Sequence, residues 1–454
     1  MYYNTYIKDK KPAKENQAES NKLIDKVHGF LSPLLEKLEN KLDKRYVYTF
    51  FDLFFGILSF RDRANGLLLS ELGGYVNGPK NAPAGTKRIS NLLRNKDWSH
   101  KDVEEVFSSK MEEKTQDPNQ AGKQWLMLWD DGVIEKHESW FSEGLCPVKS
   151  SKAGRLTKIK PGYYQKISGR ICVPGHEWSA AVLSTRSDDK PQVAAMKWWT
   201  TRGKHKEERS NVFYTMLIEM VGILTRLQLC VWHILDRGYA NGITLERMFH
   251  LKQRFIVRWK YNLLLTNKAG LTKNTFKHAM GCRAVSHKQV WDKERKQPRN
   301  VSIAYIPVTH PDFSKKLLYL IIIRDKRKGR QPMYLLTNVA VDTIGMAWEI
   351  FFSYMKRWDI EQCFRFGKTA MAMESPRLWF WENRLKLLMI VALLMAFFFE
   401  LLQKHNLFSI QTINTWCPRT GKRQVNADLP LYRLRLAISQ LVLYELNPFY
   451  KNKG

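Results

Sequence analysis

The sequence predicts an α/β protein in which helices pack on the faces of a mixed β-sheet. Two short apolar runs, 124–131 and 229–236, have the character of buried strands, and each ends in aspartate. Segments with the period of an amphipathic helix lie before and after the second run, as expected when helices cover a sheet. A third observation is a block of β-like runs at 262–341, which predicts a β-rich insertion.

Length and charge limit the classes of function. The chain has 454 residues, of which 44% are hydrophobic, enough for two to three domains with a substantial core. A formal net charge of +31 indicates a polyanionic partner, either nucleic acid or an anionic membrane. The apolar run 387–399 is shorter than the roughly 18–20 residues of a spanning helix. The sequence also lacks the basic amphipathic helix of a membrane-surface protein, so we expect no membrane partner.

The N-terminus and the cysteines indicate a reduced compartment. Residues 1–20 are polar and charged, and we expect a flexible tail without the apolar core of a secretory signal. The six cysteines form no CxxC pair, which argues against a zinc site or a disulfide framework. The resulting expectation is a cytoplasmic protein that binds nucleic acid.

Residues 21–120 predict an N-terminal helical domain. Two of its helices are expected to begin at the N-caps Thr86 and Ser99. Lys87 and Arg88 lie in a basic cluster on the first of these helices, and we interpret them as DNA contacts. A solvated helix face is the alternative. The turn-rich segment 115–123 marks the end of this domain.

Residues 121–261 and 342–403 are expected to form one domain built on the sheet. After strand 124–131, two further strands are predicted with a turn between them at Pro174-Gly175. The resulting β-β-β-α-β-α-β order is consistent with a sheet of the ribonuclease-H type. The predicted segments are strands at 165–173 and 177–186, a helix at 205–227, a strand at 229–236, a helix at 243–251 and a strand at 254–259. Residues 262–341 form the insertion, and 404–454 predict a helical segment suited to dimer contact.

The segment 354–368 carries four chemically different polar groups on one helix face. At 100° per residue, Tyr354, Arg357, Glu361 and Lys368 fall within a sector of about 60°, and Arg365 lies close to it. A carboxylate can bind a cation while Arg, Lys and Tyr hold phosphate oxygens. The alternative is a solvated face with ion pairs between successive turns.

Two aspartate positions complete an acidic set with Glu361. Asp130 and Asp131 end the first predicted strand, and Asp236 ends the strand at 229–236. Hard oxygen ligands of this kind suit two Mg²⁺ or Mn²⁺ ions, which can activate a nucleophile and stabilise a leaving oxygen in phosphodiester chemistry. Neighbours on a strand point to opposite faces, so only one of Asp130 and Asp131 can face Asp236. A lone Asp at a strand end is more often a turn former.

The segment 354–368 resembles a known signature. Tyr-x2-Arg-x3-Glu-x6-Lys is similar to the YREK motif of a family of bacterial insertion-sequence transposases, the cut-and-paste DDE type with a ribonuclease-H-like core. The contexts WDDG and LDRGY are similar to those of the family's first and second aspartates. Gly132 stands where the family often has Thr. The resemblance extends over residues 85–402 and favours Asp130 as the first acid.

The resemblance implies a metal-dependent DNA transposase that excises and inserts a DNA element. Such an enzyme would act on double-stranded DNA as a homodimer, in the bacterial cytoplasm beside the nucleoid. Because related hairpin-forming enzymes place a Trp on the strand before YREK, Met333, next to Tyr334, is the candidate base wedge here. The catalytic and metal-binding residues that the resemblance implies are Asp130, Asp236 and Glu361, and the DNA-binding residues that it implies are Tyr354, Arg357, Lys368 and Met333. Arg365, Arg237, Lys87 and Arg88 are predicted as further DNA contacts.

Two alternatives stay open. A metal-dependent nuclease or resolvase on the same fold would share the three acids without needing YREK or the insertion. A non-catalytic, domesticated derivative would keep the basic charge while its acids drifted, and here all three acids are present. Terminal inverted repeats around the coding DNA would separate a mobile element from a housekeeping nuclease.

Overall fold

The computed structural model opens with five helices. The prediction that residues 21–120 are mainly helical is confirmed. The first helix begins earlier than expected, so residues 14–20 belong to a helix and not to a tail. The helices are α1 (Lys14–Glu39), α2 (Lys44–Ser59), α3 (Leu69–Asn77), α4 (Ala82–Arg94) and α5 (His100–Gln116). The structure describes residues 14–60, 62–139, 141–150, 162, 164–165, 171–187, 190–292, 297–325, 331–403, 407–417 and 430–443. The expected tail residues 1–13 lie outside these ranges.

The two predicted N-caps have different outcomes. Ser99 caps α5, and its backbone N–H donates to the Asp102 carboxylate at 2.8 Å. Thr86 instead lies inside α4, where its hydroxyl donates to the Ala82 carbonyl oxygen at 2.9 Å. The helix begins at Ala82 because Pro83 suits a first helical turn, which the expectation of a start at Thr86 overlooked.

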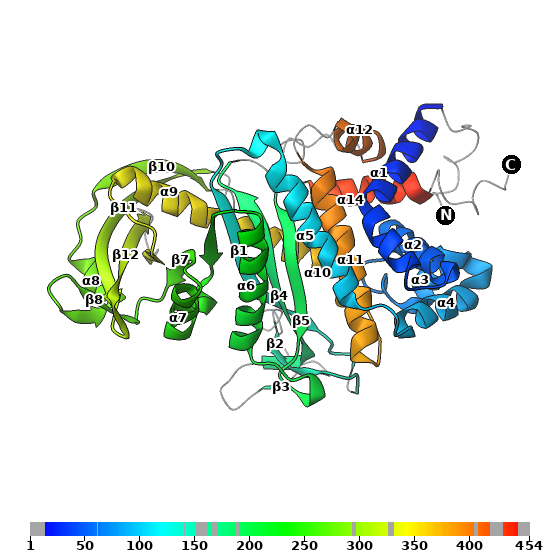
Figure 1. Ribbon diagram of the computed structural model, residues 1–454, viewed down its shortest axis with the longest axis horizontal. Coiled ribbons are helices and arrows are strands. Elements are labelled where there is room, and N and C mark those ends of the chain that lie inside the picture. Colours follow the sequence, from blue (N-terminus) through cyan, green and yellow to red (C-terminus); the bar gives the residue numbers. More distant parts are fainter. Residues whose placement is uncertain are drawn as a thin grey trace.

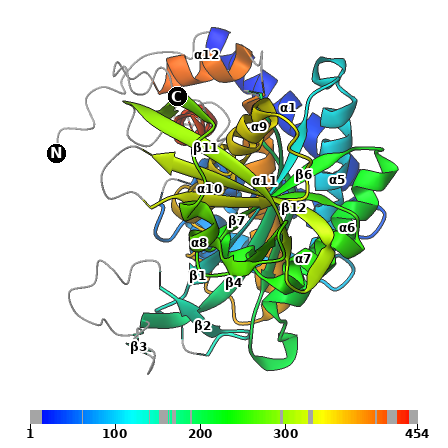
Figure 2. The same ribbon diagram turned by 90° about the vertical axis from the view of Figure 1, so that its left-hand side faces the viewer.

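A mixed sheet of thirteen strands runs through the described residues. Figures 1 and 2 show the sheet with helices packed beside it. Within it, β1 (Trp125–Glu135) lies between antiparallel β4 (Ile171–Thr185) and parallel β6 (Val231–Leu235). β7 (Arg254–Trp259) is parallel to β6, and β5 (Gln192–Trp199) pairs with the other edge of β4. The connecting helices are α6 (Arg209–Arg226) before β6 and α7 (Gly242–His250) before β7; β2 (Cys146–Lys149) and β3 (Tyr164–Gln165) pair with β4.

Two strand assignments from the sequence are wrong. β1 does not end at the two aspartates but continues to Glu135, because β4 remains paired with it along its whole length. The two strands predicted on either side of Pro174-Gly175 are not separate there, because residues 171–173 of the first and 177–185 of the second lie in one long strand, β4. Gln165 belongs to β3, and residues 166–170 lie outside the described ranges. Gly175 permits the continuous strand, since a Cβ there would collide with the Ile134 carbonyl oxygen. The third strand of the predicted order is therefore β5, which the sequence analysis did not identify.

The β-rich insertion extends the same sheet. β13 (Met333–Thr337) is antiparallel to β7, with Tyr334 opposite Trp259, and β12 (Phe313–Asp325) and β11 (Gln297–His310) continue outward from it. In Figure 1 these strands occupy the end of the molecule opposite the N-terminal helices. The elements are β8 (Leu264–Asn267), β9 (Thr272–Asn274), α8 (Thr275–Met280), β10 (Ser286–Asp292), β11 (Gln297–His310), β12 (Phe313–Asp325) and β13 (Met333–Thr337).

Helix α11 (Trp381–Leu401) joins the sheet to the N-terminal helices. It is buried on nearly every side and lies between them in Figure 1. The Phe397 ring packs 5.2 Å from Phe30 and 6.1 Å from Phe54, so α1 and α2 share a hydrophobic core with α11. Near the C-terminus lie α12 (Leu407–Trp416) and α14 (Leu431–Leu441). Among the described helices, none combines the length and hydropathy needed to cross a membrane.

Candidate active site

Asp130 and Asp236 follow matching positions on two parallel strands. The last residue pair between β1 and β6 joins Trp129 and Leu235, and each aspartate comes next on its strand. Parallel strands point their carboxyl ends to the same edge of a sheet, where functional groups collect. The backbone pairing therefore places the two carboxylates at the same edge of the β1–β6 pair, although β1 itself continues beyond Asp130.

The YREK segment is two helices and not one. α9 (Ile344–Met355) ends before Lys356, and α10 (Trp358–Thr369) begins after Arg357. The junction is a tight turn in which the Arg357 N–H donates to the Tyr354 carbonyl oxygen at 3.0 Å. The expected single helix is thus interrupted at the arginine.

Arg357 meets all three predicted acids. Its Nη2 lies 2.6 Å from Glu361 Oε1, its Nη1 lies 3.5 Å from Asp130 Oδ2, and its Nε lies 3.9 Å from Asp236 Oδ1. The Tyr354 hydroxyl donates to Asp236 Oδ1 at 3.5 Å. The structure therefore brings together five of the predicted site residues from β1, the end of β6 and the α9–α10 junction.

Lys368 lies on the last turn of α10, and its Nζ is close to Gly132 of β1. A Cβ at Gly132 would approach its Nζ to 3.8 Å and the Phe364 ring to 2.9 Å. Glycine in place of the family's Thr is explained by the Phe364 ring, which packs against the strand here. Arg365 is exposed, and its guanidinium lies over the Trp358 ring at 5.6 Å.

Asp131 faces away from this site. Its carboxylate accepts a hydrogen bond from the Ser179 hydroxyl at 2.6 Å and is paired with Arg209 of α6, also at 2.6 Å. Because side chains alternate along β1, Asp130 lies on the side of Asp236 and Glu361, whereas Asp131 lies on the opposite side of the strand.

Burial controls the ionisation of the site. It raises the pKa of Asp130 to about 7; the Arg357 charge opposes this rise, and the Asp236 charge adds to it. Burial also raises the pKa of Tyr354 to about 12, so its hydroxyl keeps its proton at neutral pH. Although burial alone lowers the pKa of Arg357, Tyr354 and the three carboxylates raise it, so the guanidinium stays charged.

The donor set fits a hard divalent cation. Carboxylate oxygens are the ligands that Mg²⁺ and Mn²⁺ prefer, and three of them converge here from separate elements. Within the described ranges, no group of three or more His, Cys, Asp or Glu side chains is arranged to share a metal ion. At this site the Arg357 guanidinium stands among the three carboxylates. Asp130, Asp236 and Glu361 would hold the ion if Arg357 turned away.

The remaining predicted DNA contacts lie in two other places. Arg237 and Met333 line a pocket of about 780 Å³ next to Asp236, together with Arg258 of β7. Lys87 and Arg88 lie on α4, on the far side of α11 from the acids in Figure 1. Lys87 is exposed, whereas Arg88 forms an ion pair with Asp52 of α2 at 3.0 Å. The structure does not bring these two basic residues to the acidic site.

Sequence reasoning missed Arg209 and Arg258. Two adjacent aspartates signal that one of them needs a cationic partner, but not that this partner lies on the helix after β5. Arg258 lies between buried Val257 and Trp259 on a strand predicted only as core. A charged residue inside an otherwise apolar run was the available signal.

The chain matches no protein-family model, and no curated protein is detectably similar to it.

Proposed function

We propose that the chain is a DNA transposase that catalyses metal-dependent excision and strand transfer of an insertion sequence. The observation that carries this proposal is the contact of one guanidinium, Arg357, with Asp130, Asp236 and Glu361. Such convergence is not expected of a solvated helix face, because the three acids come from three distant parts of the chain. The YREK spacing supplies the link to transposition.

The order of the central strands supports a ribonuclease-H-like core. β1, β4 and β5 form an antiparallel meander, and β6 and β7 then lie parallel to β1 on its other side. The strand order β5-β4-β1-β6-β7 is the one expected for that fold. It also leaves Asp130 on the central strand and Asp236 on its neighbour.

The proposed chemistry needs both the acids and the bases of the site. Two Mg²⁺ or Mn²⁺ ions would polarise the attacking water or 3′-hydroxyl and stabilise the leaving oxygen of the phosphodiester. Asp130 must ionise to take part, which its raised pKa opposes until a cation is near. Arg357 would then exchange its carboxylate partners for phosphate oxygens, and its planar fork suits a bidentate contact. Tyr354 remains a hydrogen-bond donor at neutral pH.

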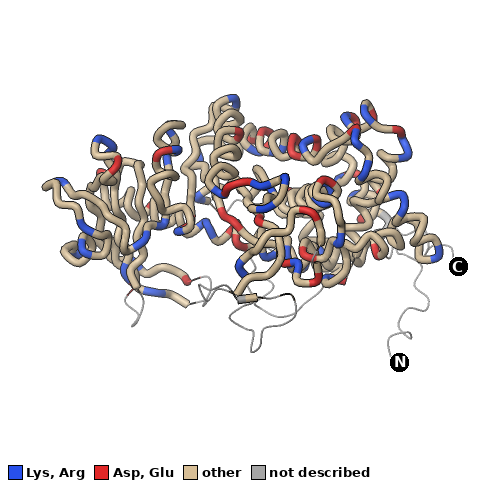
Figure 3. The backbone as a smooth tube through the Cα atoms, turned by 90° about the horizontal axis from the view of Figure 1, so that it is seen from below, with Lys and Arg blue, Asp and Glu red and all other residues tan. Residues whose placement is uncertain are grey.

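The charge of the protein supports DNA as the substrate. Lys and Arg lie along the whole length of the described chain, at the β-rich end and at the helical end (Figure 3). A net charge of +31 would give strong, salt-dependent binding to a duplex. Two element ends must be joined, so the proposal includes a homodimer on DNA, with the C-terminal helices as the candidate contact.

The test is excision of a marked DNA segment by the purified protein. The substrate carries a marker between the DNA sequences that flank the coding region, and we expect excision with free 3′-hydroxyl ends in Mg²⁺. Terminal inverted repeats should be found in those flanks. Cleavage that ignores the flanks would favour the nuclease alternative, and specific binding without cleavage would favour the domesticated one.

A further inference from the structure

The backbone pairing between β1 and β6 ends just before Asp130 and Asp236, so no backbone hydrogen bonds of this strand pair hold the two aspartates together. Trp129 and Leu235 are the last paired residues, and the chain turns into a short 3₁₀ helix, η5 (Arg237–Tyr239), directly after Asp236. β1 meanwhile continues straight alongside β4. The two strands diverge at the position where the proposed chemistry needs their carboxylates at a fixed separation.

Arg209 bridges this gap from the other side of the sheet. Its Nε and Nη2 each lie 2.6 Å from Asp131 Oδ2, next to Asp130 in the chain. Its Nη1 donates to the Gly238 carbonyl oxygen at 3.3 Å, two residues after Asp236, and the guanidinium lies 4.9 Å from the Tyr239 ring. One side chain thus holds both diverging segments.

The surroundings fix this bridge at both ends. The Ser179 hydroxyl donates to the second Asp131 oxygen at 2.6 Å, and the Trp199 indole N–H donates to Ser179 at 2.9 Å. At the other end, a Cβ on Gly238 would lie 2.7 Å from Arg209 Nη2. Glycine therefore makes room for the close approach of the guanidinium.

We propose that Arg209, through Asp131 and Gly238, sets the separation of the carboxylates of Asp130 and Asp236 for metal binding. Arg209 is a positioning residue, since it contacts neither acid. This inference rests on the proposed function. Residues that orient metal ligands from behind typically change metal affinity by about 10–100-fold when they are removed.

The test is Mn²⁺ binding by the full-length protein without DNA. Binding is measured from the decrease in the electron paramagnetic resonance signal of free Mn²⁺. Glu361→Gln removes a direct ligand and reports whether the site exists. Arg209→Ala should weaken Mn²⁺ binding by about tenfold. Arg209→Lys should recover only part of this loss, because one ammonium cannot reproduce the guanidinium fork. Arg45→Ala, which breaks the pair between Arg45 and Asp43 among the N-terminal helices, is the control and should bind as the wild type does.

Gly238→Ala keeps the test decisive if Arg209→Ala folds poorly. The added methyl meets only the flexible end of Arg209, so it should displace the guanidinium while leaving the fold and the charge intact. Competition against Mn²⁺ supplies a second readout. Mg²⁺ demands near-ideal octahedral geometry and Ca²⁺ does not, so a misplaced carboxylate should weaken Mg²⁺ several-fold more than Ca²⁺.

The outcomes separate the two proposals. If Glu361→Gln binds Mn²⁺ as tightly as the wild type, the metal site of the proposed function is wrong, and the positioning role is wrong with it. If Glu361→Gln loses binding while Arg209→Ala and Gly238→Ala keep it, only the positioning role is overturned. Equal losses of Mg²⁺ and Ca²⁺ affinity, together with a lower melting temperature, would also overturn it, because they indicate a merely structural residue.

Discussion

Arg357 Nη2 lies 2.6 Å from Glu361 Oε1, one turn further along the chain, and the same guanidinium reaches Asp130 and Asp236. An arginine among three carboxylates neutralises charge that would otherwise repel within a partly buried site. A cation bound by the carboxylates and a phosphate bound by the arginine would replace these contacts together. The resting arrangement is therefore complementary to both parts of the proposed substrate complex.

The two neighbouring aspartates should behave differently. Asp130→Asn should abolish cleavage of element-end DNA, because it removes a carboxylate that faces Asp236 and Glu361. Asp131→Asn should leave appreciable cleavage at a reduced rate, because Asp131 acts only through Arg209. A cleavage assay in Mg²⁺ compares the two variants. The reverse pattern would show that the metal ligand is Asp131.

The acidic site was predictable because each of its carboxylates belongs to a segment whose pattern can be recognised from the neighbouring residues alone. Buried apolar runs that end in Asp, and one carboxylate among bases at helical spacing, are visible in the sequence, and parallel strands bring their ends together. The break at Arg357 was not visible, since it occurs where the arginine meets acids from distant segments. The continuous β4 was missed because Pro174-Gly175 has the composition of a turn, whereas Gly175 here permits close contact with β1.

Met333 is a candidate wedge for an extruded base. It is half-buried on β13 and lines the pocket that also contains Arg237 and Trp259. Extruding a base costs a few kcal/mol, which stacking on such a side chain can offset. Met333→Ala should therefore reduce hairpin formation at the cleaved end without preventing the first nick. Tyr334→Ala is the second variant to test, since Tyr334 is next to Met333 and lines the same pocket. Normal hairpin formation by both variants would exclude the wedge.

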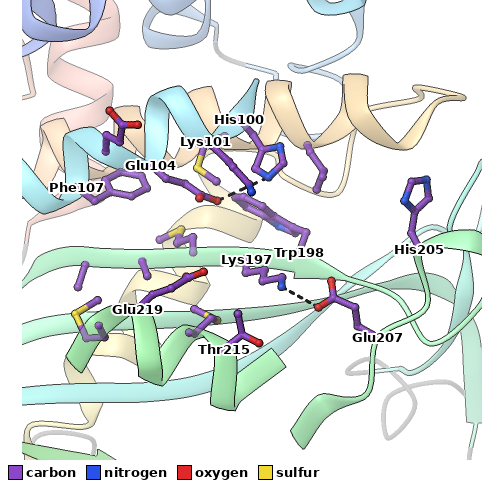
Figure 4. A pocket seen from close by; sticks show the side chains of 18 of the residues that line it. His100, Lys101, Glu104, Phe107, Lys197, Trp198, His205, Glu207, Thr215 and Glu219 are labelled. Atoms are coloured by element: carbon purple, nitrogen blue, oxygen red, sulfur yellow. Dashed lines mark hydrogen bonds and ion pairs between the residues drawn. The ribbon is translucent and has the colours of Figure 1, made fainter. Parts of the chain in front are cut away.

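Glu104 should make stability depend on pH. It lies on α5 in a cleft of about 660 Å³ and faces Glu219 of α6 (Figure 4). Burial, and next the Glu219 charge, raise its pKa to about 7. Between about pH 4.5 and 7 the folded chain keeps a proton that the unfolded chain has released, so stability falls as pH rises through this window.

Glu104→Gln should remove this effect. We expect its melting temperature to exceed that of the wild type by about 1–2 °C at pH 8 and to match it at pH 5. The gain is modest because the Glu104 side chain is 37% exposed and water moderates the penalty. Glu112→Gln, at an exposed position on the same helix, should show no such difference. An equal gain at both pH values would mean that the stabilisation is unrelated to ionisation.

Substitutions of Glu361 and of the basic residues in its segment should distinguish side chains needed for cleavage from side chains needed for DNA binding. Glu361→Gln keeps the size of the side chain but removes one anionic ligand, so cleavage should fall by several orders of magnitude. The variant should still bind end DNA, and more tightly, because a negative charge near phosphate is lost. Arg357→Ala and Lys368→Ala should instead weaken DNA binding, each with a salt dependence shallower by about one phosphate contact.

Arg357→Ala should have the larger effect of the two, since a guanidinium can hold a phosphate through two hydrogen bonds and an ammonium acts as a point charge. It should also lower the melting temperature without metal, because it leaves three carboxylates without their shared partner. Gel shifts and cleavage assays in Mg²⁺ across a range of salt concentrations measure these differences. If Glu361→Gln still cuts DNA at the wild-type rate, the three acids are only an ion-paired surface and the transposase proposal is wrong.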